Sequence, residues 1–221
     1  MTLKALLGIE LPIIQAPMAG AQKSALAIAV SNAGGLGSLP CAMLDDAAIR
    51  REVDAIRAGT SHPFNVNFFC HTQPEPNAAQ ESAWRAALAP FYAEYGIDAS
   101  TIPVGPGRRP FDGNMAALVE ALRPPVVSFH FGLPSADLLE RVRRTGATIL
   151  SSATTVDEAV WLEQHGADAV IAQGVEAGGH RGMFLSADIA TQVGTFALVP
   201  QVVAAVRVPV IAAGGIADAR G

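Results

Sequence analysis

Cysteine, charged residues and long apolar runs are all scarce in this chain of 221 residues. The two cysteines, Cys41 and Cys70, cannot form a disulfide framework, and their spacing is not that of a metal-binding pair. Charged residues make up 16% of the chain, the net charge is -5, and the sequence contains no basic cluster. We therefore expect neither nucleic acid nor an anionic membrane as a partner.

Membrane and targeting signals are also missing from the sequence. No apolar run reaches the ~18 residues of a membrane span. Residues 1–12, MTLKALLGIELP, have no secretory signal pattern, which together with the low cysteine content predicts a cytoplasmic protein. The five histidines form no HxxxH or HxH cluster, so we expect no metal site. Half of the residues are hydrophobic, which suits one large α/β domain.

Short apolar segments alternate with helix-like segments along most of the chain. We predict seven buried strands, at residues 12–18, 35–40, 64–69, 126–132, 147–154, 168–174 and 208–216. Helices are predicted at 24–32, from Asp45 or Asp46 onward, after Ser135, after Thr155, and at 195–206. Thr155 and Glu158 have the spacing of a capping box.

This alternation indicates a parallel sheet with helices on its outer face. No GxGxxG turn follows the first strand, which favours a (β/α)₈ TIM barrel over a doubly wound sheet. An eighth strand cannot be found, because the sequence reaches Gly221 after the seventh. We therefore expect a TIM-barrel domain over residues 1–221 that is incomplete at its C-terminus.

Residues 71–125 interrupt the regular alternation, because they are too many for an ordinary connection between strand and helix. They include a helix with Trp84, Leu88, Phe91 and Tyr95. The segment is predicted to be an insertion or a lid. Arg108 and Arg109, in its second half, are interpreted as solvated loop charges.

His130 is the leading candidate for chemistry. Side chains of a strand alternate between its two faces, so Val126, Ser128 and His130 share one face and Val127, Phe129 and Phe131 the other. The second, uniformly apolar set is predicted to lie against the outer helices. His130 is then the last inward residue, at the C-terminal mouth where barrel enzymes place their active sites. A structural core histidine is the alternative.

At other strand ends the sequence has amide side chains, or glycines whose backbone no side chain covers. Asn67 and Gln173 are predicted to lie on the mouth side, although a loop-binding role would explain Asn67 equally well. The pairs Gly178–Gly179 and Gly214–Gly215 would let backbone N–H groups approach an anion, and His180 follows the first pair. The backbone from Ala16 through Pro17 to Met18 could lie along a flat ring. Together these features fit a flat, phosphorylated cofactor such as FMN.

Several motifs carry a resemblance to a known family. PIIQAPMAG, NVNFF, SFHFGLP, GADAVIAQGVEAGGHRG, VGTFALVPQV and PVIAAGGIADARG occur in this order over essentially the whole chain. Together they resemble the class I nitronate monooxygenases, formerly called 2-nitropropane dioxygenases. That family is FMN-dependent, combines a (β/α)₈ barrel with a smaller second domain, and oxidises alkyl nitronates with O₂ to a carbonyl compound and nitrite.

The resemblance assigns roles to residues. It implies that His130 is the catalytic base and that His180 lines the substrate pocket. FMN contacts would fall on Ala16, Pro17, Met18, Asn67, Gln173, Gly178, Gly179, Gly214 and Gly215. It further implies that the smaller domain is largely missing here, that propionate 3-nitronate is a suitable substrate, and that a homo-oligomer is possible.

Two alternatives stay open at the level of the sequence. A flavin-dependent enoyl-acyl-carrier-protein reductase shares the barrel and a similar EAGGH loop, but it would lack the histidine of HFG and would consume NAD(P)H. A non-catalytic remnant that binds flavin weakly is the second alternative. The loop after strand six, residues 174–194, contains no cysteine, which argues against a nucleotide dehydrogenase with a cysteine nucleophile.

Overall fold

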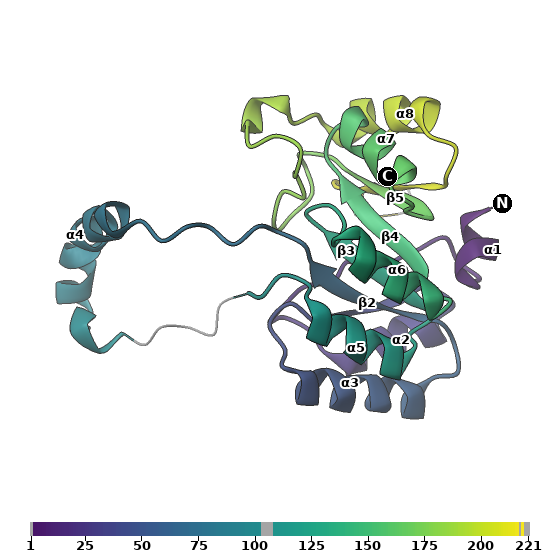
Figure 1. Ribbon diagram of the computed structural model, residues 1–221, viewed down its shortest axis with the longest axis horizontal. Coiled ribbons are helices and arrows are strands. Elements are labelled where there is room, and N and C mark those ends of the chain that lie inside the picture. Colours follow the sequence, from purple (N-terminus) through teal and green to yellow (C-terminus); the bar gives the residue numbers. More distant parts are fainter. Residues whose placement is uncertain (1, 103–107, 217, 219–221) are drawn as a thin grey trace.

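The computed structural model describes residues 2–102, 108–216 and 218. Its parallel strands form a curled sheet in the order β1-β2-β3-β4-β5-β6, with helices on the outer face (Figure 1). The strands are β1 (Gly37–Pro40), β2 (Phe64–Phe69), β3 (Val126–His130), β4 (Thr148–Ala153), β5 (Ala169–Gln173) and β6 (Val210–Ala213). The helices are α1 (Leu3–Leu7), α2 (Ser24–Asn32), α3 (Asp46–Gly59), α4 (Ala78–Glu94), α5 (Gly113–Leu122), α6 (Ala136–Arg144), α7 (Val156–Gln164) and α8 (Thr195–Ala205).

The expected strand at residues 12–18 is not formed, so the described sheet has six strands and not seven. The segment makes a single parallel bridge, between Ile14 and Leu36. Leu36 donates to the carbonyl of Ile13 and accepts from the amide of Gln15, and the pairing stops there. Pro12 and Pro17 flank these contacts and have no N–H to donate, which limits the ladder to one step. The other predicted strands are present.

The outer face of the sheet carries the main hydrophobic core. Val66, Phe68, Val127 and Phe129 lie between the strands and helices α3 and α5, with Phe68 and Phe129 each 1% exposed or less. Burying a side chain of this size contributes roughly 2 kcal/mol or more. The alternation predicted for β3 is therefore confirmed for Val127 and Phe129.

The inner face of the curled sheet is polar near β2. The Nδ2 of Asn65 donates to Oγ of Ser38 at 3.1 Å and to Oγ of Ser128 at 2.8 Å. The Nδ2 of Asn67 donates to the same Ser128 oxygen at 2.9 Å. These side chains are buried, and their bonds join three neighbouring strands across the inner face. Ser128 therefore points inward, as predicted, directly below His130 in β3.

Helix ends agree in part with the sequence patterns. Asp45 caps α3, and its Oδ1 accepts from the amide of Ala48 at 2.7 Å. Thr155 caps α7 by accepting from the amide of Glu158, but the carboxylate of Glu158 does not complete the predicted capping box. Ser135 stands at the N-cap of α6 without a side-chain cap bond. The carboxylate of Glu158 instead accepts from Thr154 and from the backbone amides of Phe184 and Leu185.

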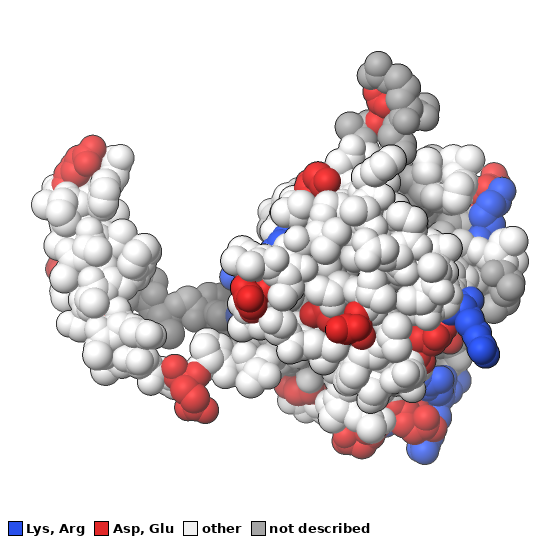
Figure 2. Space-filling view, turned by 90° about the horizontal axis from the view of Figure 1, so that it is seen from above, with Lys and Arg blue, Asp and Glu red and all other residues white. Residues whose placement is uncertain are grey.

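The segment 71–125 divides into two parts. Helix α4 lies apart from the body in Figure 1, and none of its residues is buried. Trp84 is 66% exposed and Tyr95, just after the helix, is 70% exposed. Figure 2 shows the same separation and few charged side chains on this helix. In contrast, α5 packs between α3 and α6 as an ordinary outer helix. The role of the segment as a lid stays a prediction.

Neither a membrane-spanning helix nor a metal-binding cluster occurs among the described residues. No helix combines the length and hydropathy needed to cross a bilayer. No group of three or more His, Cys, Asp or Glu side chains in this part of the chain could hold a metal ion.

Candidate active site

His130 ends β3 at the C-terminal edge of the sheet, and both of its ring nitrogens are engaged. Nδ1 lies 3.0 Å from Oγ of Ser152 in β4, and Nε2 lies 3.2 Å from the carbonyl oxygen of His180. A carbonyl oxygen can only accept, so we assign the ring proton to Nε2. Nδ1 then accepts from the hydroxyl of Ser152. The ring is thus held between a neighbouring strand and the segment that follows β5.

Aromatic rings surround the imidazole of His130. Its centroid lies 4.5 Å from that of Phe131 and 5.8 Å from that of Phe69. Phe131 has a φ of +67°, in the left-handed region that side chains rarely adopt. This turn ends the strand alternation and directs Phe131 toward His130 and His180. The expectation that Phe131 lies against the outer helices is therefore wrong.

Burial changes the acidity of His130. The pKa of the imidazole is lowered from 6.5 to about 4, mainly by desolvation and to a smaller extent by the charges of His180 and Arg181. The bond to the carbonyl of His180 acts in the opposite direction but is the weaker effect. The ring is therefore neutral at pH 7. A neutral imidazole can accept a proton, which is what a general base requires.

A cavity of about 270 Å³ opens beside His130. Its lining residues are Phe69, His71, Gln73, Arg108, Phe131 and His180. Arg108 is exposed in a loop, as interpreted from the sequence, and it also lines this cavity. Arg109, the next residue, points elsewhere and lies 3.9 Å from the carboxylate of Asp46. One cation and two histidines at a small, partly apolar cavity favour a small anionic ligand.

Gln173 and Asn67 are both buried at the mouth side, as predicted, and both are bound within the protein. The amide of Gln173 donates to the carbonyl of His180 at 2.9 Å, and its oxygen accepts from the amide of Gly182 at 2.7 Å. It thereby fixes the segment that contacts His130. Asn67 donates to Ser128 of β3, both to its hydroxyl and to its carbonyl oxygen.

The two glycine pairs belong to neighbouring turns. A β-carbon at Gly214 would lie 2.7 Å from the backbone nitrogen of Ala177, so the turn after β6 approaches the turn after β5 closely. Gly178 and Gly179 are exposed with open space around their α-carbons, and Gly179 has a φ of +76°. Bare backbone with a left-handed residue is the geometry that leaves N–H groups free for an oxyanion. The residues present therefore fit a phosphate group.

A carboxylate also lies near these turns. Glu176 accepts from the amide and the hydroxyl of Thr195 at 2.7 and 2.8 Å, and so caps the N-terminus of α8. These bonds lower the pKa of Glu176, so it is ionised at neutral pH. The helix end is thus already occupied by an anion. A phosphate would have to bind to the glycine turns and not to α8.

Residues 16–18 border β1. Ala16 and Met18 are exposed and Pro17 is half-buried. The segment is held by Gln22, whose Nε2 donates to the carbonyls of Ala16 and of Ser38 in β1. The carbonyl of Met18 also accepts from the amide of Ala21 at 3.1 Å. The exposure of Ala16 and Met18 suits the predicted contact with a flat ring.

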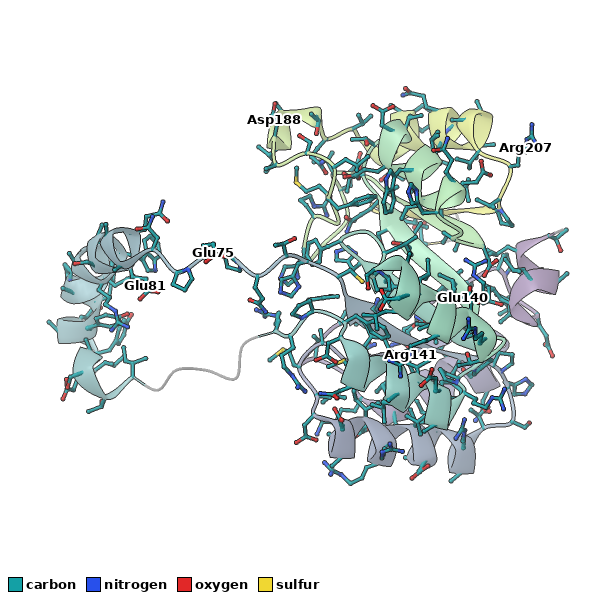
Figure 3. The ribbon with its side chains drawn as sticks, viewed as in Figure 1. Glu75, Glu81, Glu140, Arg141, Asp188 and Arg207 are labelled. Atoms are coloured by element: carbon teal, nitrogen blue, oxygen red, sulfur yellow. The ribbon has the colours of Figure 1, made fainter. Side chains whose placement is uncertain are left out.

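The segment between β5 and α8 leaves the sheet on the same side as the chain that leads to α4. Figure 3 shows Asp188, at the tip of the first segment, and Glu75, in the second, on this side of the body. His130, His180, Gln173 and the cavity are thereby brought to one edge of the sheet. The glycine turns follow the C-terminal ends of β5 and β6 at the same edge.

Three further residues shape this site, and the sequence patterns assigned none of them a role in it. Ser152 contacts the ring nitrogen of His130, and Gly182 packs against the ring. Glu158 binds the segment that carries Gly182. Ser152 could have been found from the alternation of β4, since it is the last inward-facing residue of that strand. The other two act through tertiary contacts, which no local pattern reveals.

The chain is similar to proteins of known family. A family model described as nitronate monooxygenase matches residues 1–221. A nitronate monooxygenase from Paraburkholderia phytofirmans is 45% identical over 98% of this chain and 59% of its own length. The crystal structure of nitroalkane oxidase from Streptomyces ansochromogenes has a TM-score of 0.81 and 40% identity, over 94% of this chain and 59% of that one.

The chain is also similar to a second solved structure, with a lower TM-score and a lower sequence identity. FabK from Thermotoga maritima has a TM-score of 0.71 and 30% identity, over 99% of this chain and 55% of that one. The chain thus spans less than two thirds of the length of each of these relatives.

Proposed function

Because this chain belongs to the nitronate monooxygenase family, we propose that the protein oxidises alkyl nitronates with O₂ to a carbonyl compound and nitrite. The observation that carries the proposal is the position of His130. It stands at the C-terminal edge of the strands, neutral at pH 7 and next to a cavity lined by aromatic rings, two histidines and the cation of Arg108. Propionate 3-nitronate is a suitable substrate.

FMN is the proposed cofactor. Its phosphate would be held by the turns of Gly178, Gly179, Gly214 and Gly215, and its ring by the amides of Asn67 and Gln173 and the backbone of Ala16, Pro17 and Met18. Bound FMN would accept electrons from the nitronate and pass them to O₂. The open space at Gly178 and Gly179 supports this arrangement.

His130 would act on neutral nitroalkanes, which still carry the α-proton that a nitronate has lost. The base must offer an unprotonated nitrogen to the substrate. In the structure Nε2 holds the proton against the carbonyl of His180, and the lone pair is on Nδ1 beside Ser152. In the other tautomer the proton is on Nδ1, which donates a hydrogen bond to the hydroxyl of Ser152, and Nε2 carries the lone pair that a base needs. The carbonyl of His180 must then turn away from Nε2, because two acceptors repel each other. Ser152 therefore supports both tautomers.

Arg108, His71 and His180 would bind the anionic part of the substrate. All three line the cavity, whose volume of about 270 Å³ suits a small-molecule ligand. The guanidinium of Arg108 can bind a nitronate or a carboxylate through two parallel N–H groups. Phe69 and Phe131 form the apolar part of the lining and exclude water from the reacting carbon.

Aerobic release of nitrite from propionate 3-nitronate, with FMN added and NAD(P)H omitted, tests the proposal. The intact protein is compared with its His130→Asn variant. We expect nitrite from the intact protein, and a loss of turnover of neutral nitroalkanes by about 100-fold or more in the variant, the size of a general-base contribution. A folded, yellow protein that releases no nitrite and oxidises NADPH would instead indicate the enoyl reductase.

A further inference from the structure

Glu158, in the first turn of α7, is a buried carboxylate with four hydrogen-bond donors around it. It is 1% exposed. One oxygen accepts from the amide of Thr154 at 2.7 Å and from its hydroxyl at 2.8 Å. The other accepts from the amides of Phe184 at 2.6 Å and Leu185 at 3.1 Å. No ion pair of Glu158 occurs within the described part of the chain.

Such an arrangement is costly unless every contact is made, because a buried charge loses its hydration. The two sides of the carboxylate bind different parts of the chain. Thr154 follows β4, the strand that carries Ser152, whereas Phe184 and Leu185 lie far along the segment after β5. Glu158 thus joins that segment to the end of β4.

The segment held by Glu158 is the one that packs on His130. A β-carbon at Gly182 would lie 2.7 Å from Cε1 of His130 and 3.1 Å from Nδ1. The ring of Phe184 covers Gly132, where a β-carbon would lie 3.1 Å from it, and contacts Trp161 at 5.2 Å between centroids. Gly182 therefore lies against the imidazole, and the side chain of Phe184 lies against the turn that follows it.

We propose that Glu158 is a positioning residue for His130. Its carboxylate holds the 182–185 segment against the imidazole, and so keeps the ring dry and in one orientation. An effect of this positioning on turnover rests on the proposed function. The orientation and the protonation of the imidazole do not depend on it. Glu158 acts through Phe184, Leu185 and Gly182 and touches no reacting atom.

The protonation state of His130 reports on this contact. The charged groups facing the ring are His180 and Arg181, both in the segment after β5, and from β2, β3 and β4 it meets Phe69, Phe131 and Ser152. Burial is the main reason that its pKa is low. If the segment is released, water reaches the ring and the charged groups of the segment move away, and both changes raise the pKa. The loss of the bond to the His180 carbonyl acts in the opposite direction, but desolvation is the larger effect.

The experiment is an NMR titration of the His130 imidazole in the intact protein, with the signal assigned by His130→Asn. Glu158→Gln keeps the size of the side chain. Its NH₂ group, however, replaces one of the two oxygens that accept hydrogen bonds from Thr154, Phe184 and Leu185, and an NH₂ group cannot accept from these donors. We expect the pKa of His130 to rise by about one unit or more in this variant. The titration requires no turnover, so its result is independent of whether the protein oxidises nitronates.

Glu163→Gln is the matched control. Glu163 lies in the same helix, and its carboxylate also accepts from two backbone amides, those of Arg207 at 2.6 Å and Val208 at 2.9 Å. Those residues precede β6 and are remote from the ring, so the pKa of His130 should not change. An equal shift in both variants would show a general loosening of α7 and would overturn the proposal.

An unshifted His130 in a folded Glu158→Gln protein would also overturn it. If that variant does not fold, Glu158→Asp takes its place. Its side chain is one methylene shorter and cannot reach both Thr154 and the amides of 184–185, so the same upward shift is expected. A His130 that titrates as in the wild type would then contradict the proposal.

Discussion

Gly182 packs directly against the imidazole of His130, with only 2.7 Å between the position of a β-carbon at residue 182 and Cε1 of the ring. The two residues are 52 positions apart in the sequence. They meet because β3 and β5 end at the same edge of the sheet, where the segment after β5 begins. The absence of a side chain at 182 is what allows the contact.

Gly182→Ala should therefore destabilise the protein. The added methyl group must displace the ring or the segment, and overpacking of this kind typically costs about 1–3 kcal/mol of unfolding free energy. Denaturant unfolding measures the change. Gly113→Ala is the control, because its methyl group would meet only the guanidinium of Arg141 at 3.8 Å. Equal stability of the two variants would contradict the close contact.

His130 should make stability depend on pH. Its pKa is lowered in the folded protein to about 4, from about 6.5 when unfolded. Above pH 6.5 the ring is neutral in both states and contributes nothing. As the pH falls from 6.5 to 4, only the unfolded chain takes up the proton, so folding is progressively destabilised.

The full effect of His130, reached near pH 4, is on the order of 3 kcal/mol. It is measured as the difference in unfolding free energy between the wild type and His130→Asn, at pH 7 and at pH 4. The variant should lose less stability on acidification. If both proteins lose stability in parallel, the ring is not desolvated as the structure indicates.

Arg108 and Arg109 should differ in their effect on substrate binding. Arg108→Met removes a cation from the lining of the cavity, so we expect the KM for a nitronate that also carries a carboxylate to rise about tenfold. The KM for a nitronate with an uncharged alkyl chain should rise less. Arg109→Met removes the adjacent cation, which faces Asp46, and should leave both KM values within about twofold. Equal effects of the two variants would exclude a special role for Arg108.

The two cysteines should be unreactive in the native protein. Desolvation raises the pKa of Cys41 to about 12 and also raises the pKa of Cys70. Only the thiolate is nucleophilic, so a thiol reagent at pH 8 should modify neither residue until denaturant is added. Rapid labelling of the native protein would show that one of them opens to solvent. Both cysteines then serve as small apolar residues.

Much of the architecture could be predicted from periodicity. The alternation of β3 placed Val127 and Phe129 in the outer core and His130 at the mouth, and the structure confirms these positions. Of the two predicted starts of α3, Asp45 and Asp46, Asp45 is the cap. The errors fall where tertiary contacts override the local pattern. Phe131 leaves the strand through a positive φ, and the segment 12–18 makes one bridge because prolines interrupt its donors.

The sequence by itself determined the order of strands and helices, the parallel sheet, and the family, because each of these depends on residues close together in the chain. The tertiary structure alone decided what surrounds His130. Ser152, Gly182 and Glu158 come from different elements and meet only when the strands align at one edge. Hydrogen bonds and burial depend on distances in space, and these are set by the packing of the whole sheet.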